Sequence, residues 1–133
     1  MYITFERKAW RSSSHAVSIC RDGEISFNKA LTQMFLRKGY GWALFLVDRE
    51  EMRLAVRPLT HPDRRAYRIT YHRNARQSWV CSKSFLKSLG WDGCRYQLFA
   101  SWNSRRLLVE FDLPVWEERS KAKVVVMKAR RAG

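Results

Sequence analysis

The 133-residue chain is 46% hydrophobic and 14% aromatic, which excludes a disordered polymer and predicts one domain with a real core. Its longest apolar run, residues 42–47, is far shorter than the roughly 20 residues of a membrane helix, so we expect a soluble protein. A net charge of +14, from 26 Lys and Arg against 12 Asp and Glu, makes nucleic acid the expected partner.

Short strands open the chain. Residues 2–5 have the pattern of a strand, and a basic, serine-rich stretch separates them from a second strand over residues 15–20. The Asp-Gly pair at residues 22–23 predicts a tight turn, because glycine adopts positive φ without strain. Residues 24–27 then alternate polar and apolar side chains, as a half-buried strand does.

A helix and a hairpin follow these strands. Asn28 is a good N-cap and Gly39 a good stop, so we expect a helix between them. Three apolar residues at helical spacing form its buried face: Leu31, Met34 and Phe35. Residues 42–47 are typical of a buried strand, and residues 52–56 of the strand that returns from a hairpin turn.

The same order of elements returns 54 residues later without a gap. Residues 79–81 predict a strand, Ser82 an N-cap, and residues 96–100 and 107–111 a second hairpin. The apolar face of the second helix is Phe85, Leu86 and Leu89. Matching residues fall at the helix start, the turn glycine and the strand core, which favours a tandem repeat over two unrelated stretches with similar turns.

The two halves are joined by residues 59–77, within which residues 66–71 alternate like a strand. Each half is therefore predicted to run β-β-α-β-β, in a β-rich α+β fold. We place the first half-unit, with its leading strands, at residues 1–58 and the second at residues 59–116. Residues 117–133 are expected to form a basic C-terminal tail.

A family resemblance begins in the unit from Gly23 to Leu31, which is followed by a glycine turn and a hairpin ending at Arg57-Pro58. This unit resembles the AbrB/SpoVT (MraZ-related) swapped-hairpin module, over residues 23–58 and more weakly over 77–113. The resemblance implies two half-units that interleave into one small, pseudo-symmetric, barrel-like domain. It also implies duplex-DNA binding by a transcriptional regulator or antitoxin. The chain departs from the family in lacking a proline before each helix.

Basic residues supply the candidate contacts to phosphate. The densest group lies between the first hairpin and the start of the second half: Arg53, Arg57, Arg64, Arg65, Arg68, Arg73 and Arg76. Period-two alternation places Arg68 on the outer face of its strand, and Tyr67, Ile69 and Tyr71 on the core side.

Further candidates come from the two strand-to-helix corners, where the resemblance implies that DNA is met. The first corner pairs Arg21 with Lys29, and the second pairs Arg76 with Lys83. The remaining basic candidates are Arg7, Lys8 and Arg11 near the N-terminus and Lys87 on the second helix.

The tryptophans divide by context. Trp42 and Trp79 lie in apolar strands and are expected in the core. Trp91 and Trp102 lie in predicted turns and Trp10 lies beside basic residues, so these three rings are candidates for stacking on bases. Packing against their own hairpins is the alternative for the loop tryptophans.

Catalytic patterns are missing from the sequence. The three histidines have no metal-ligand spacing, and no glycine-rich phosphate loop is present. We therefore predict a non-enzymatic protein without metal or cofactor. Three cysteines without a CxxC pair and the lack of a signal peptide predict a cytoplasmic location.

Three functions fit this pattern. The first is a duplex-DNA-binding regulator or antitoxin-like module. The second is an RNA-binding or single-stranded-DNA-binding accessory subunit of a larger nucleoprotein complex, favoured by the richness in Arg and Trp. The third is a protein-interaction module that docks an acidic partner. Because a tandem repeat can close its own barrel, the chain is expected to be a monomer or a homodimer.

Overall fold

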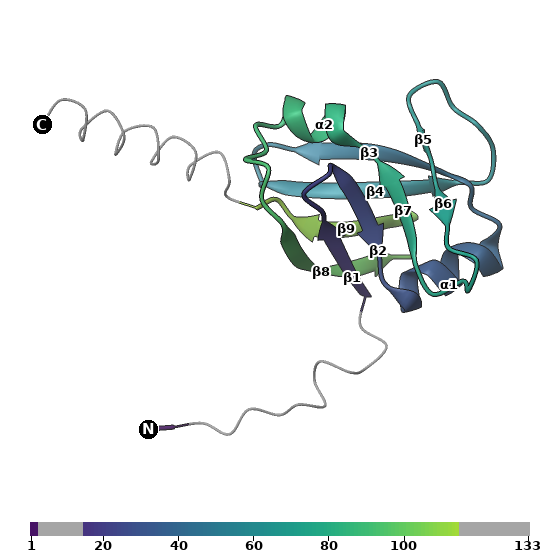
Figure 1. The fold of residues 1–133 in the computed structure, drawn as a ribbon, viewed down its shortest axis with the longest axis horizontal. Helices are drawn as coiled ribbons and strands as arrows, with labels where there is room; N and C mark the ends of the chain where they lie inside the picture. The colour runs from purple at the N-terminus through teal and green to yellow at the C-terminus, as the bar shows by residue number, and fades with distance from the viewer. Residues whose placement is uncertain (3–14, 115–133) are drawn as a thin grey trace, which may run out of the picture.

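A computed structural model describes residues 1–2 and 15–114 (Figure 1). These residues form strands β1 (His15–Ile19), β2 (Glu24–Phe27), β3 (Trp42–Asp48), β4 (Arg53–Leu59), β5 (Tyr67–Arg68), β6 (Thr70–Tyr71), β7 (Ser78–Cys81), β8 (Tyr96–Asn103) and β9 (Leu108–Asp112), and helices α1 (Lys29–Lys38) and α2 (Lys83–Ser88). The predicted β-rich, barrel-like fold class is confirmed. Residues 3–5 of the strand expected at residues 2–5, and the tail at 117–133, fall outside the described part of the chain.

The strands of the described residues form one antiparallel sheet in the order β5-β3-β4-β9-β8-β1-β2-β7-β6. The two end strands, β5 and β6, are consecutive in the chain and are separated by Ile69 alone. The Ile69 N–H donates to the Gly41 carbonyl at 2.8 Å. The sheet therefore curls into a nearly closed barrel. The single strand predicted at residues 66–71 is wrong in this respect, because Ile69 divides it.

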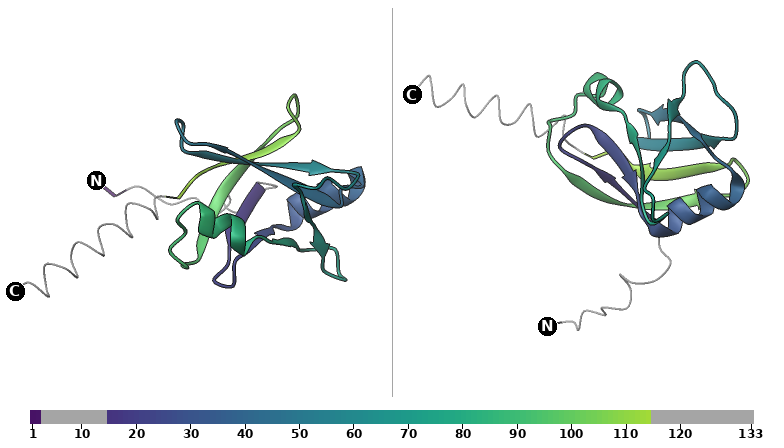
Figure 2. Two further views of the ribbon diagram at one scale, coloured as in Figure 1. Left: turned by 90° about the horizontal axis from the view of Figure 1, so that it is seen from above. Right: turned by 45° about the vertical axis from the view of Figure 1, so that its right-hand side comes forward.

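The halves interleave within the barrel. β1, β2, β3 and β4 of the first half pair with β8, β7, β5 and β9 of the second. If each strand is replaced by its counterpart in the other half, the cyclic order of the strands around the barrel stays the same. A pseudo-two-fold axis therefore passes between β2 and β7 on one side of the barrel and between β4 and β9 on the opposite side. In the left view of Figure 2, the β3–β4 and β8–β9 hairpins project upward and the two turns before β2 and β7 project downward.

The core lies inside the barrel, and the helices pack against it. Leu31, Met34 and Phe35 of α1 are buried, as the helical spacing predicts, and the Phe27 and Phe35 rings meet edge to face at 5.0 Å. On α2, Phe85 stacks on Phe45 of β3 at 4.6 Å. Helix packing thus joins elements of both halves in one core.

The helix starts differ between the halves. Asn28 Oδ1 accepts from the Leu31 N–H at 3.2 Å, so the predicted N-cap of α1 is confirmed. Gly39 ends α1 in the left-handed conformation, at φ +73°. Ser82 occupies the predicted N-cap position of α2, but its hydroxyl makes no cap hydrogen bond and donates instead to the Gly23 carbonyl at 3.2 Å.

Two hairpins extend beyond the barrel; we call β3–β4 arm 1 and β8–β9 arm 2. Their turns are built alike. Asp48 Oδ1 accepts from the Glu51 N–H at 3.0 Å, and Asn103 Oδ1 accepts from the Arg106 N–H at 3.1 Å. The residue before each returning strand, Met52 or Leu107, has positive φ. Asp48 and Asn103, like Met52 and Leu107, are one residue further apart in the sequence than the 54 residues that relate the two halves in the gapless alignment.

Candidate nucleic-acid interface

One side of the barrel, which we call the β2–β7 face, carries a row of outward side chains across four strands. Trp79 lies opposite Ser26, Ser26 opposite Ser18, and Ser18 opposite Gln97. Their neighbours along each strand fill the core, so these four side chains alternate outward. The row places hydroxyl, amide and indole groups side by side.

A polar groove of about 330 Å³ runs along this face. Arg76 and Arg95 are its charged residues, and no carboxylate lines it. Its complete lining is Ala16, Ser18, Cys20, Ser26, Phe27, Asn28, His72, Asn74, Arg76, Gln77, Arg95 and Gln97. Amides and guanidiniums are the groups that pair with base edges and phosphates.

The first cationic corner brings Arg21 beside the start of α2. Gly23, in the turn after Arg21, accepts hydrogen bonds from the Ser82 N–H at 3.1 Å and the Ser82 hydroxyl. A Cβ on Gly23 would lie 2.5 Å from the Lys83 Cβ. The turn before β2 is therefore packed against the first residue of α2. This corner consists of Arg21 and Lys83.

The second cationic corner lies at the other end of the β2–β7 ladder. Phe27 pairs with Ser78, so the turn that contains Arg76 meets the start of α1 at Lys29. The sequence-based pairings of Arg21 with Lys29 and of Arg76 with Lys83 are wrong. Because β2 and β7 are antiparallel, the turn before each strand meets the helix that follows the other.

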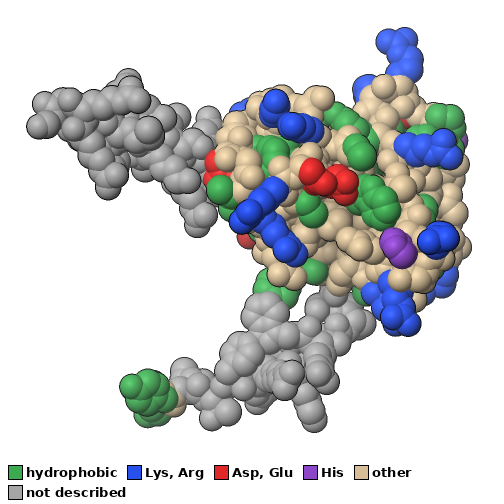
Figure 3. Space-filling view, viewed as in Figure 1, with side chains coloured by type: hydrophobic (Ala, Val, Ile, Leu, Met, Phe, Trp, Pro, Cys, Tyr) green, Lys and Arg blue, Asp and Glu red, His purple; other side chains and the backbone are tan. Residues whose placement is uncertain are grey.

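Charges on the β2–β7 face are largely uncompensated. In the strands β1, β2, β6 and β7 and their turns, the acidic residues are Asp22 and Glu24. Burial, and then the nearby Asp22 carboxyl, raise the pKa of Glu24. Figure 3 views this face: Lys and Arg side chains lie around its margin, with a small acidic patch between them.

Salt bridges neutralise few of the basic residues. Within residues 15–114, the one salt bridge joins Arg65 Nε to Asp63 Oδ1 at 3.2 Å, on the exposed loop after β4. Hydrogen bonds from the Arg65 side chain and backbone lower the pKa of Asp63. The four side chains of the two corners therefore remain available to phosphate oxygens.

The cations predicted between Arg53 and Arg76 do not form one surface. Arg53 and Arg57 lie on β4, on the side of the barrel opposite Arg73 and Arg76. Arg64, Arg65 and Arg68 are exposed on the loop after β4 and on β5. Lys87, a separate candidate, is exposed on α2. Four predicted site residues fall outside the described ranges: Arg7, Lys8, Trp10 and Arg11.

The alternation predicted around Arg68 is confirmed. Arg68 is exposed, whereas Tyr67, Ile69 and Tyr71 pack against or within the core. The Tyr71 hydroxyl donates to the Tyr40 carbonyl at 2.6 Å, and burial raises the pKa of Tyr71 to about 12. These tyrosines hold the divided leading strand of the second half against the barrel.

The structure contradicts the core assignment of two tryptophans and, for two others, favours the packing alternative. Trp42 and Trp79, expected in the core, are half-buried on the outer faces of β3 and β7. Trp91 and Trp102 pack against the core instead, and Trp102 belongs to β8 rather than to a turn. The Lys38 ammonium lies 5.4 Å from the Trp102 ring centroid. Trp79 is thus a residue of the β2–β7 face that was not predicted from the sequence, although its alternation with the apolar Val80 is consistent with an outward position.

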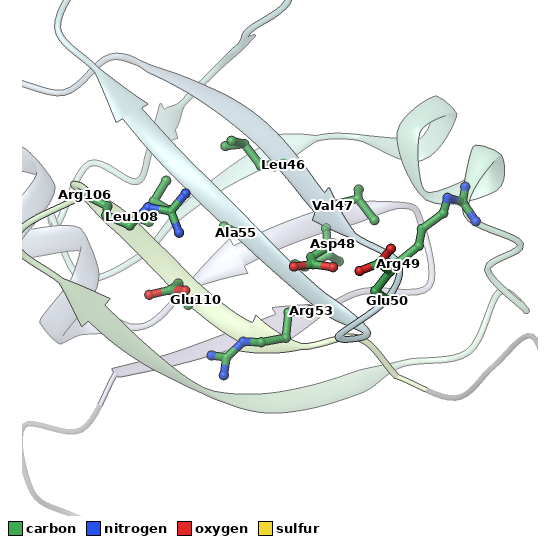
Figure 4. Close-up of a pocket in the computed structure, with 11 residues that line it drawn as sticks. Leu46, Val47, Asp48, Arg49, Glu50, Arg53, Ala55, Arg106, Leu108 and Glu110 are labelled. Carbon is green, nitrogen blue, oxygen red and sulfur yellow. The ribbon is translucent and has the colours of Figure 1, made fainter.

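A second cavity, of about 460 Å³, lies between the two arms on the opposite side of the barrel (Figure 4). Its lining mixes both signs of charge over apolar strand residues: Leu46, Val47, Asp48, Arg49, Glu50, Arg53, Leu54, Ala55, Arg106, Leu108 and Glu110. We call it the arm cleft. Its carboxylates oppose phosphate binding, so the polar groove is the better nucleic-acid site.

The described residues contain neither a group of metal ligands nor a membrane-spanning helix. No three His, Cys, Asp or Glu side chains come together there as metal ligands, and neither helix is long and apolar enough to cross a membrane. No family model matches the chain, and no curated protein or solved structure is significantly similar to it. Function therefore has to be argued from the site itself.

Proposed function

We propose that the chain is a non-enzymatic nucleic-acid-binding protein that holds duplex DNA against its β2–β7 face. The observation that carries this proposal is the pair of cationic corners at the two ends of the β2–β7 ladder, with a carboxylate-free groove beside it. Cations at both ends bind phosphates, and the polar side chains between them reach base edges.

The spacing of the corners suits a duplex groove. The four paired residues of β2 and β7 span about 14 Å, so the corners are roughly 15–20 Å apart. Phosphates on the two sides of a major groove about 12 Å wide are separated by a similar distance. Lys29 and Lys83 each begin a helix at equivalent places in the two halves, which matches the local two-fold symmetry of a duplex.

Base contacts are expected from the groove. Asn and Gln pair bidentately with adenine, and Arg pairs with guanine. Gln77 and Gln97 supply amides along the groove, and Arg76 and Arg95 supply guanidiniums. These groups support some sequence preference in addition to electrostatic attraction.

The test replaces the four corner residues with alanine: Arg21, Lys29, Arg76 and Lys83. Each lost phosphate contact lowers the salt slope of log K by about 0.9, so binding to a short duplex at about 0.1 M salt should weaken roughly a thousandfold. Fluorescence anisotropy across a salt series measures both quantities. The control removes the same charge from β4 and the arms, at Arg49, Arg57, Arg105 and Arg106, and should lower affinity far less.

Equal losses in the two quadruple variants would reject the β2–β7 face as the binding surface. A nuclease-treated wild-type protein that binds no duplex at low salt would reject nucleic-acid binding altogether. Circular dichroism and thermal melting of each variant establish that the fold is retained.

A single strand is the second candidate ligand, favoured by aromatic side chains on the same side. Trp79 is half-buried on the outer face of β7, and Phe99 of β8 is 60% exposed. Rings beside a polar groove stack on unpaired bases. Competition between a duplex and its separate strands decides the matter: tighter strand binding, with fluorescence quenching lost in Trp79→Phe and kept in Trp102→Phe, favours this alternative.

A further inference from the structure

The arm cleft is a concave surface that lies outside the proposed nucleic-acid-binding face. Arm 1 and arm 2 both project on this side of the barrel, as the left view of Figure 2 shows, and Leu46, Ala55 and Leu108 contribute apolar side chains to the lining of the cleft. It lies on β4 and β9, across the barrel from the polar groove. A concave apolar surface with a charged rim is typical of an interaction site.

Charge on this side is balanced, unlike the rest of the chain. The cleft is lined by three cations, among them Arg53 and Arg106, and by three carboxylates, among them Glu50 and Glu110. In Figure 4 the Arg49 side chain points away from the other labelled groups. Arg53 Nε is buried and has no hydrogen-bond partner within the described residues. A surface that carries charges of both signs is complementary to the same surface on a second copy of the chain.

The arm tips carry apolar side chains in a conformation that disfavours them. Met52 and Leu107 have φ of +53° and +56°, where glycine or asparagine is the usual residue. Their side chains are 40% and 45% exposed. The same combination at equivalent places on both arms points to a role outside the fold, because neither local geometry nor core packing requires it.

We propose that the arm cleft is the interface of a homodimer, and that a second copy of this chain is its occupant. A +14 chain repels its copies at most surfaces, and the mixed-sign cleft is where that repulsion is weakest. Self-complementary charge around an apolar centre suits a two-fold contact, in which the same patch serves both partners.

The strand register shows how the charges would match. Arg53 of β4 lies directly opposite Asp112 of β9, both facing outward. A dimer axis parallel to these strands and between them sets Arg53 of one copy against Asp112 of the other, twice. The Met52 and Leu107 side chains at the arm tips then contact the apolar lining of the second copy.

This inference is independent of the proposed function, since it uses the opposite side of the barrel. One consequence rests on both: the dimer presents its two β2–β7 faces outward and binds two duplex segments at once. Dimerisation is therefore measured without nucleic acid, and the corner variant serves as a control that should dimerise normally.

The experiment uses reciprocal charge reversal in the full chain. One variant carries Arg53→Glu and the other carries Asp112→Arg, so each reverses one partner of both matched pairs. Sedimentation velocity on nuclease-treated protein should show a wild-type dimer and two variants that self-associate at least about a hundredfold more weakly, because like charges now face each other. Mixing the two variants should restore a dimer, which also shows that both are folded.

A third variant, Met52→Ser with Leu107→Ser, removes the apolar tips without altering charge or core and should weaken the dimer about tenfold or more. A wild-type chain that stays monomeric at millimolar concentration overturns the proposal. So does a dimer that resists all three variants, or a pair of reversed variants that fails to associate when mixed. A complex with a different, acidic protein in place of self-association would also reject it.

Discussion

The two sides of the barrel that the pseudo-two-fold axis crosses share one backbone plan and carry different surfaces. Each is an antiparallel pair that joins the two halves, β2 with β7 on one side and β4 with β9 on the other. The β2–β7 side has small polar residues and cationic ends. The β4–β9 side has apolar residues, carboxylates and guanidiniums between projecting arms. Core residues line the inner face on both sides, whereas the outward residues differ.

The turns on the two sides of the barrel differ in which residues have positive φ. On the β2–β7 side, positive φ is taken by Gly23, which is buried against α2, and by Ala75 in the turn before β7. On the arm side, positive φ is taken by Met52 and Leu107, which are exposed. The tightly packed Gly23 stabilises the fold, whereas the strained Met52 and Leu107 at the arm tips destabilise it. Substitutions at these turns therefore separate what each side contributes to stability and to binding.

The largest effect is expected from Gly23→Ala, with Gly39→Ala as its matched control. Both glycines have positive φ, but a Cβ on Gly23 meets Lys83 whereas one on Gly39 meets nothing within 4 Å. Gly39→Ala should lower the free energy of unfolding by about 1 kcal/mol from strain, and Gly23→Ala by about 2–4 kcal/mol from strain and overlap. Urea denaturation measures both.

The same pair tests the first corner. Displacing the turn from α2 separates Arg21 from Lys83, so Gly23→Ala should also weaken duplex binding at a temperature where both variants are folded. Gly39→Ala leaves that corner intact and should bind as the wild type does. Equal destabilisation of the two variants would contradict the tight packing of Gly23 against α2.

Smaller and opposite changes are expected at the arm tips. Met52→Gly and Leu107→Gly relieve the positive-φ strain, offset in part by the greater freedom of glycine in the unfolded chain. Each should raise the free energy of unfolding by about 0.5–1 kcal/mol at protein concentrations too low for dimers. A loss of stability in both would show that the tip side chains support the fold, which would weaken the case for an interface.

Local features were predicted well from the sequence. The start and end of α1 depend on the Asn28 cap and on Gly39, and both act within a few residues. The strands at 24–27 and 42–47 follow from alternation and apolar composition, so their positions were also found. The order of elements in the two halves could be predicted because each half repeats the same local signals.

Long-range features were not predictable in the same way. The corners exchange partners because β2 pairs with β7 across the halves, and no local pattern reports that pairing. Trp79 sits on the outer face because Val80 takes the inner position, and a four-residue strand gives little basis for choosing between them. The division of the charges between two sides likewise depends on the barrel closing through Ile69.

The smallest effect concerns Glu24, the carboxylate that burial and Asp22 make easier to protonate. Because its pKa is raised, the β2–β7 face loses a negative charge at a higher pH than an ordinary glutamate would allow. Duplex binding should therefore tighten as pH falls from neutral, and Glu24→Gln should bind about two- to fivefold more tightly at pH 7. The advantage of the variant should vanish at acidic pH, where the wild-type carboxyl is neutral as well. Other titrating groups on this face, His72 among them, are present in both proteins, so the ratio of their dissociation constants isolates Glu24. An unchanging ratio from neutral to acidic pH would mean that the carboxyl lies away from the bound DNA, and would move the contact toward the corner at Lys29 and Arg76.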